Sequence, residues 1–186
     1  LQEAAGRAVS RQQGLHLSAQ VAVASADRVQ EARAVGARDL ARLMEQALDE
    51  MLNSARLATV ASWVARAEMR GVTAPIVGVA QAEIDLRHGL HMKAQAEALR
   101  ALSQVGLDSR IRFRVLEVGA RAAHVGSREE EALDLYVQAA QCAPDPRSER
   151  RALWGRVMCS AALEIEEAHE LFRGLEQTTP RHDLEE

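Results

Sequence analysis

The chain has 186 residues, a formal net charge of −4, and 47% hydrophobic and 27% charged residues. This is an ordinary globular composition, which excludes a chain that is disordered throughout, and the negative charge argues against a phosphate-binding nucleic-acid surface. Its apolar runs stay shorter than about 18 residues, so we predict no membrane span.

Eight helices are predicted, because capping residues, glycines and prolines recur at short intervals. Their approximate ranges, in chain order, are 27–52, 53–71, 73–89, 91–105, 108–126, 127–144, a seventh that opens at 145, and an eighth around 168–178. Asp108 is expected to cap the fifth helix, and Ser127 with Glu130 forms a capping box for the sixth. Asp145, followed by Pro146 at the first helical position, opens the seventh. Connections this short predict antiparallel neighbours.

A spacing of small residues repeats along the second half of the chain. The recurring positions, copy by copy, are Ala82, Gly89, Ala94, Ala98 and Ala101; then Gly119, Gly126, Ala132, Tyr136, Ala139 and Pro144; then Trp154, Ala168 and Phe172. Small residues let the two helices of a hairpin approach closely. A larger residue, Tyr136 or Phe172, is expected to fill the gap toward the next hairpin.

At these residues the sequence resembles the tetratricopeptide-repeat family. The repeat that begins around Arg110 matches best, because Ala132, Tyr136, Ala139 and Pro144 fall at the spacing of the family's second helix. The resemblance covers about residues 53–178. It implies an all-α, right-handed superhelical solenoid of about three antiparallel helix hairpins, with irregular helices over 1–52 and a tail over 179–186.

The preceding repeat departs from the family pattern. Asp85 stands where an aromatic residue is usual, with Leu86 beside it. This variant is similar to the degenerate repeats of large bacterial signalling ATPases and of maltose-regulator-type transcription activators. Together with a first residue, Leu1, that is not methionine, the resemblance leads us to expect a segment of a larger cytoplasmic bacterial protein with a role in signalling or transcription regulation.

Two pairs of opposite charges recur at the same helical spacing. Glu83 and Arg87 are four residues apart, and Glu117 and Arg121 repeat this arrangement 34 residues later. Each pair can stabilise its own helix by about 0.2–0.5 kcal/mol, which is one interpretation. The resemblance implies another, since the first helix of each hairpin lines the concave groove of such a solenoid. The candidate groove contacts are then Glu83, Arg87, Glu117, Arg121 and Arg156.

The histidines give no metal or catalytic pattern. His88 and His91 straddle a turn glycine and could begin a zinc site, but no cysteine or third histidine lies near them in sequence. We therefore interpret them, and His124 beside another turn, as solvent-facing residues, and His169 as a helix-surface residue. Since nucleophile patterns and phosphate-binding loops are also missing, we predict no enzyme, metal or cofactor.

The cysteines and tryptophans are expected to pack in the hydrophobic core. Cys142 and Cys159 are too few for a disulfide framework and lie in helical patterns. Trp63 and Trp154 lie on first helices, where packing between hairpins is the simpler interpretation. An exposed tryptophan would instead mark an anchor for a partner.

A chain of this kind is best interpreted as a protein-interaction or regulatory module, a scaffold or a sensor. Its groove would bind a peptide, a protein or another domain of the same chain, and a terminal hairpin could pair with a second copy because end repeats need covering. The alternative is a small-molecule sensor domain, which needs a closed pocket with convergent polar groups. An RNA reader needs a basic, stacking-rich groove, and five aromatic residues argue against one.

Overall fold

The computed structural model describes residues 36–178, and all the regular structure in that range is helical. A first helix runs through residues 36–53, and its predicted start at Asp27 lies outside the described residues. The helices that follow are α2 (Leu57–Met69), α3 (Pro75–Arg87), α4 (His91–Leu102), α5 (Ser109–Val125), α6 (Glu129–Gln141), α7 (Pro146–Ala162) and α8 (Ala168–Thr178). The prediction of an all-α chain is confirmed for the described range.

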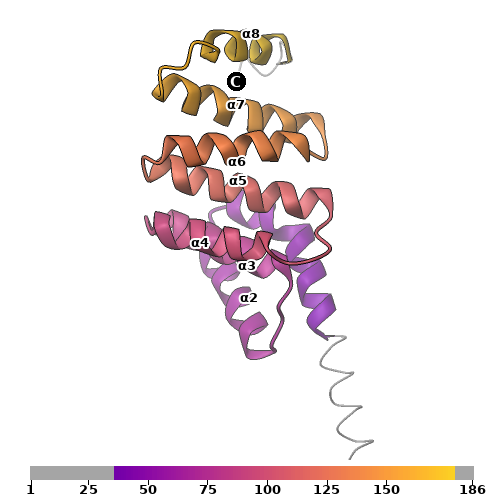
Figure 1. Cartoon of the computed structure of the whole chain (residues 1–186). Helices are drawn as coiled ribbons and strands as arrows, with labels where there is room; N and C mark the ends of the chain where they lie inside the picture. Colours follow the sequence, from indigo (N-terminus) through magenta and orange to yellow (C-terminus); the bar gives the residue numbers. More distant parts are fainter. Residues whose placement is uncertain (1–35, 179–186) are drawn as a thin grey trace, which may run out of the picture.

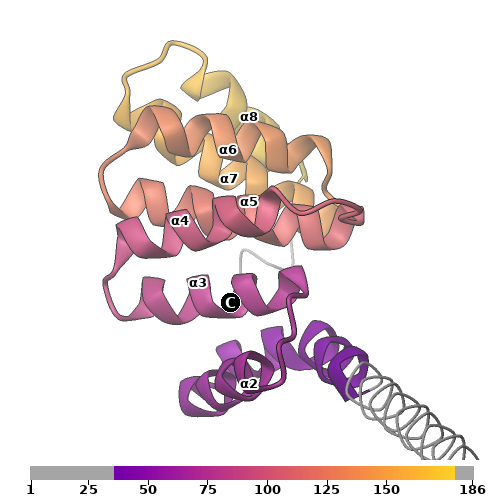
Figure 2. The same ribbon diagram turned by 60° about the horizontal axis from the view of Figure 1, so that its bottom comes forward.

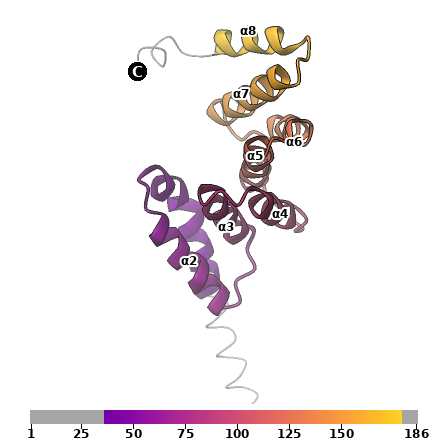
Figure 3. The same cartoon turned by 90° about the vertical axis from the view of Figure 1, so that its left-hand side faces the viewer.

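The helices pack in the order of the sequence, as Figure 1 shows. Each helix from α2 to α8 contacts the next one, and α3 also contacts α5, as α5 contacts α7. Figure 3 shows α3, α5 and α7 on one side of the stack and α4 and α6 on the other. In Figure 2, α2 and the helix of residues 36–53 lie beyond α3 at one end. We call the shared side of α3, α5 and α7 the first-helix face.

Carboxylate caps begin two of these helices, as predicted. The Asp108 carboxylate accepts a hydrogen bond of 2.8 Å from the backbone N–H of Ile111, and Asp145 accepts one of 2.8 Å from Ser148. Pro146 follows Asp145 at the start of α7. These bonds satisfy amide groups that a helix start leaves unpaired, and the one from Ser148 lowers the pKa of Asp145 below its ordinary value.

The predicted capping box at Ser127 is wrong. Ser127 has a φ of +57°, and its backbone N–H bonds to the His124 carbonyl at 2.9 Å, so it belongs to the turn that ends α5. Arg128 takes the N-cap position of α6 without a side-chain cap hydrogen bond, and its guanidinium group donates instead to Gln95. The acidic residues 129–131 lie in the first turn of α6, where the helix dipole favours negative charge.

Two other helices begin later than the capping residues predict. The N-cap of α2 is Arg56, after a turn that includes Ser54, and the N-cap of α3 is Ala74 rather than Thr73. Neither N-cap residue forms a side-chain cap hydrogen bond. Pro75 stands in the first turn of α3, where its fixed φ favours the helix and its missing N–H costs nothing.

Close contact at small residues builds the layers. Ala94 and Ala132 occupy equivalent positions on α4 and α6, and both are 0% exposed, as the repeat predicts. Ala168, the third member of the series, is half-buried at the start of α8, the last described helix. A Cβ at Gly119 of α5 would lie 3.3 Å from the Ala98 Cβ of α4, so the two backbones approach as closely as small residues allow.

Tyr136 fills the gap between α6 and α7, as predicted. A Cβ at Gly155 of α7 would overlap the Tyr136 ring, so the glycine makes room for the aromatic side chain. Phe172 holds the matching position on α8 but is 45% exposed, because no described helix follows α8. Trp154 is 51% exposed, so its predicted core role is wrong. Its neighbour Gly155 takes the core-facing position, and one residue turns a helix by about 100°.

The buried side chains form two adjoining clusters. One joins the helix of residues 36–53 to α2, α3, α4 and part of α5 through residues such as Met44 and Leu48, and Trp63 packs against it as predicted. The other lies between α5, α6 and α7 around Leu116 and Tyr136. Cys159 is fully buried in this second cluster and Cys142 packs half-buried against it, which agrees with their predicted packing role.

Candidate functional site

Carboxylates and guanidinium groups alternate along the first-helix face. Four of the five predicted groove residues lie there: Glu83 and Arg87 on α3, and Glu117 and Arg121 on α5. Residues four apart share one side of a helix, which is why each glutamate and its arginine appear on this face together.

Glu83 receives arginines from two helices while being only 7% exposed. The Nη1 group of Arg121 donates to Glu83 Oε1 at 2.9 Å, and Arg87 forms an ion pair with the same carboxylate from within α3. A buried carboxylate without such partners would be costly, so this site ties α3 to α5. Burial disfavours the charged form of Arg121, but the Glu83 and Glu117 carboxylates outweigh it and raise the pKa of Arg121.

Glu117 of α5 pairs with an arginine of α7, the following helix on the first-helix face. It is 6% exposed, and Arg151 of α7 donates its Nε to Glu117 Oε1 at 2.7 Å and its Nη2 to the other carboxylate oxygen. The guanidinium carbon of Arg151 lies 5.7 Å from the centre of the Phe113 ring, a cation–π contact. The predicted ion pair of Glu117 with Arg121 on its own helix is therefore replaced by a bidentate pair between α5 and α7.

A third link joins the helix of residues 36–53 to this face. Arg114 of α5 forms an ion pair with Asp49 and donates a hydrogen bond of 3.3 Å to the backbone carbonyl of Glu45. The Arg114 side chain is only 10% exposed, whereas Asp49 is 58% exposed. The first described helix is thus held against α5 as well as against α2 and α3.

Together these residues line a cleft of about 590 Å³, which we call the arginine cleft. Six arginines and four carboxylates leave its lining with a formal charge of +2, although the whole chain carries −4. The lining residues are Asp49, Leu52, Asn53, Glu83, Arg87, Arg110, Phe113, Arg114, Glu117, Arg121, Pro144, Asp145, Arg147, Ser148 and Arg151. Its helical lining comes from α3, α5, α7 and the helix of residues 36–53.

Two arginines of the cleft have guanidinium groups that form no ion pair among the described residues. Arg110 at the start of α5 and Arg147 at the start of α7 are both exposed. Their guanidinium groups form no ion pair with any residue between 36 and 178. A carboxylate or phosphate that enters the cleft therefore meets two guanidinium groups whose donors are free, beside four that are held in place.

Arg156, the fifth predicted groove residue, lies on α7 but does not line this cleft. It lines a different cavity of about 520 Å³ between α6, α7 and α8, which also includes Asp134 and Glu170. Five positions separate it from Arg151, and this spacing turns the side chain by about 140° around α7. Its Nε is buried and has no hydrogen-bond partner among the described residues.

Sequence reasoning missed four arginines of the cleft: Arg110, Arg114, Arg147 and Arg151. For Arg151 the signal was available, since 34 residues separate Glu83 from Glu117 and another 34 separate Glu117 from Arg151. For the others no pattern in the sequence distinguishes a cleft arginine from an exposed one, because arginine is frequent throughout this chain.

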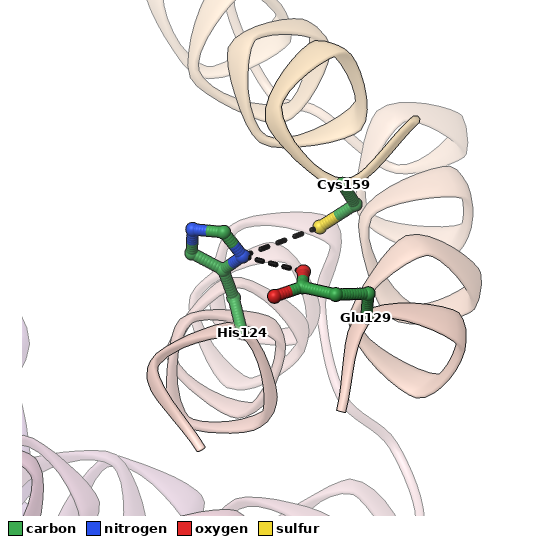
Figure 4. A group of neighbouring side chains, drawn as sticks. All are labelled: His124, Glu129 and Cys159. Carbon is green, nitrogen blue, oxygen red and sulfur yellow. Dashed lines mark hydrogen bonds and ion pairs between the residues drawn. The ribbon is translucent and has the colours of Figure 1, made fainter. Parts of the chain in front are cut away.

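A second group of side chains could hold a metal. His124, predicted to face solvent, is half-buried, and its Nδ1 lies 2.6 Å from Glu129 and 3.8 Å from the Cys159 sulfur (Figure 4). His88 is exposed and His91 is half-buried, and neither belongs to this group.

Comparisons with known proteins do not extend these observations. No protein-family model matches the chain, and neither the curated proteins nor the solved structures contain a significant match. Within residues 36–178, none of the helices combines the length and the apolar character that crossing a bilayer requires. The fold and the two groups of side chains are accordingly the basis on which a function is proposed.

Proposed function

We propose that this chain is a protein-interaction module whose arginine cleft binds an acidic segment of a partner protein or of another domain of its own chain. The observation that carries the proposal is the pair of exposed, unpaired guanidinium groups of Arg110 and Arg147 in a cleft of net positive charge. The other four arginines of the cleft pair with its carboxylates, whereas these two neutralise no carboxylate among residues 36–178.

The paired arginines support the same proposal. Arg151 directs two N–H groups to Glu117, and its side chain is still 47% exposed, so further donors face the cleft. Arg87 and Arg121, held by Glu83, are about a third exposed, at 34% and 33%. Guanidinium groups already fixed by buried carboxylates lose less conformational entropy when a second anion binds.

We further propose that α3–α4, α5–α6 and α7–α8 are the hairpins of a right-handed, tetratricopeptide-like solenoid, in which the first-helix face is concave. The contacts of α3 with α5 and of α5 with α7 support this arrangement, because a solenoid brings equivalent helices of successive hairpins together. The resemblance would make the chain part of a larger cytoplasmic bacterial signalling or regulatory protein.

A small anionic molecule is the second candidate ligand, since the cleft volume of about 590 Å³ falls in the usual range for ligand pockets. Such pockets are mostly apolar, however, and here Leu52, Phe113 and Pro144 are the apolar members of a largely charged lining. This composition favours an extended acidic segment that remains partly in contact with water.

The test is binding of a fluorescent glutamate-rich peptide to the full chain, measured by anisotropy. The double variant R110E/R147E should bind at least about tenfold more weakly, because it loses two charge contacts worth about 1 kcal/mol each and adds repulsion. Added salt should weaken wild-type binding as well. These arginines are better probes than Arg87 or Arg121, because reversing either of those removes one partner of the buried Glu83 carboxylate and places a second negative charge beside it.

The matched control is R66E/R173E, which changes the net charge equally at two exposed helix positions outside the cleft. It should bind the peptide as wild type does. An equal loss of peptide affinity in both double variants would show that net charge alone determines binding, and would contradict the proposal. Tight binding of small di- and tricarboxylates in competition with the peptide would favour the sensor role instead.

A further inference from the structure

Three successive helices bring one histidine, one glutamate and one cysteine together. His124 lies in the last turn of α5, Glu129 begins α6, and Cys159 lies in the last turn of α7. Their donor atoms all lie within 4.8 Å of one another, and Figure 4 shows the three side chains converging. Within the described part of the chain, this is the one such cluster of three potential metal ligands.

We propose that His124, Glu129 and Cys159 bind a Zn²⁺ ion, with water as the fourth ligand. Imidazole nitrogen, thiolate sulfur and carboxylate oxygen are the donors that zinc takes in proteins. Zn–N and Zn–S bonds of about 2.1 and 2.3 Å place nitrogen and sulfur roughly 3.5 Å apart in a tetrahedral site. The His124 Nδ1 and Cys159 Sγ atoms are 3.8 Å apart, so these two ligands need little movement.

The glutamate has to move further, and it is free to do so. Its Oε2 lies 2.6 Å from His124 Nδ1, a hydrogen-bond distance, whereas two ligands of one zinc ion lie roughly 3.3 Å apart. Without the ion, Glu129 and His124 share one proton at the short distance. When the zinc ion takes the place of that proton, the two ligand atoms move apart to the longer distance. Glu129 is the first residue of α6 and its side chain is 20% exposed, so a rotation of the side chain suffices.

Protons and charge balance when the ion binds. Burial, reinforced by the Glu129 carboxylate, raises the pKa of the Cys159 thiol to about 12, so the free protein holds a neutral thiol. Zinc displaces the thiol proton to water, and His124 coordinates through the Nδ1 lone pair, which leaves the imidazole proton on Nε2. The Zn²⁺, thiolate and carboxylate charges then cancel, which suits a half-buried site.

The cluster is also open to solvent. Glu129 lines a surface cavity of about 360 Å³ together with Ser127, Glu130 and Leu163, and the His124 side chain is 30% exposed. An ion can therefore enter without unfolding the stack, and water can occupy the remaining coordination position. None of the three ligands lines the arginine cleft, so this inference and the proposed partner binding stand or fall separately.

The test uses the full chain, freed of metal by a chelator. Calorimetric titration with Zn²⁺ should show one ion per chain, and a zinc concentration about 100-fold above Kd should raise Tm by roughly 5 °C. The variants H124Q and C159S should lose affinity at least about tenfold, since even residues that only support a ligand contribute that much. C142S and H169Q are the matched controls, because Cys142 and His169 lie outside the cluster, and they should bind as wild type does.

Cobalt provides a readout that does not depend on stability. Co²⁺ bound by a thiolate shows a charge-transfer absorption, which should appear in wild type and C142S and vanish in C159S. Should C159S misfold, E129Q tests the same site from its exposed side and should weaken Zn²⁺ binding with an unchanged circular dichroism spectrum. Equal zinc binding by C142S, C159S and H124Q, or no thiolate absorption with Co²⁺, would overturn the proposal.

Discussion

The two sides of α5 hold their neighbours by different chemistry. Toward α4, Gly119 lies so close to Ala98 that only small residues fit between the two helices. Beyond α5, the Tyr136 ring of α6 packs in the same way against Gly155 of α7. On the first-helix face, ion pairs through Glu117 and Arg114 provide the links. Apolar packing fixes the spacing of the layers and supplies stability, whereas paired charges contribute little net free energy after desolvation. The charged face therefore serves mainly to position arginines.

The largest expected loss of stability follows from a change in the apolar packing between α6 and α7. Truncating Tyr136, which is 6% exposed, in Y136A should lower the free energy of unfolding by about 3–5 kcal/mol, because it removes an aromatic ring from a filled space. Urea denaturation followed by circular dichroism measures this directly. A loss below about 1 kcal/mol would show that the contact between α6 and α7 is not tightly packed.

Adding one methyl group to the same contact should also destabilise the protein. G155A places a Cβ 2.2 Å from the nearest carbon of the Tyr136 ring, and we expect a loss of about 1–3 kcal/mol despite the better helix propensity of alanine. The control G174A, on α8, meets nothing within 4 Å and should be neutral or slightly stabilising. In the Y136A background the G155A penalty should disappear. Equal effects of G155A in both backgrounds would contradict the close contact.

Changes to the ion pairs should lower the free energy of unfolding less than changes to the apolar contacts. E117Q removes the charge that holds Arg151, and because Glu117 is buried while Arg151 is half-exposed, we expect a loss of about 1–2 kcal/mol. E97Q breaks the exposed pair with Arg100 and should change stability by less than about 0.5 kcal/mol. Denaturant midpoints of the two variants give the comparison, and a larger effect for E97Q would reverse the account of this face.

Apart from the E97Q control, the smallest expected loss of stability comes from the start of α7. D145A should cost about 0.5–1 kcal/mol at pH 7 through loss of the cap on Ser148. Because the folded-state pKa of Asp145 is lowered, the carboxylate adds stability above its unfolded pKa of about 3.9, and this contribution is lost as pH falls through the folded value. The difference in Tm between wild type and D145A should therefore shrink below pH 4. A difference that grows there would contradict the cap.

Local signals in the sequence predicted the elements well. Asp108 and Asp145 begin helices, and alanines 94 and 132 lie in the core, because capping and close packing depend on residue type and spacing alone. The capping box at Ser127 failed since the turn that ends α5 uses that residue at positive φ. The same turn brings Glu129 beside His124, so the group formed by His124, Glu129 and Cys159 had no signature in the sequence.

The cleft was predictable only in part, for a related reason. The four-residue spacing identified Glu83, Arg87, Glu117 and Arg121, but which arginine each glutamate binds depends on how α3, α5 and α7 are displaced relative to one another. Glu83 reaches Arg121, 38 residues along the chain. Rotation about a helix axis also removed Arg156 from the cleft.

The central claim is that the arginines of the first-helix face form a binding surface. Amide chemical shifts of the ¹⁵N-labelled chain, recorded while a glutamate-rich peptide is added, test it most directly. We predict the largest chemical-shift changes around Arg110, Phe113 and Arg147, with α4 and α6 little affected. Changes centred on α4 and α6, or an even spread over all helices, would contradict it.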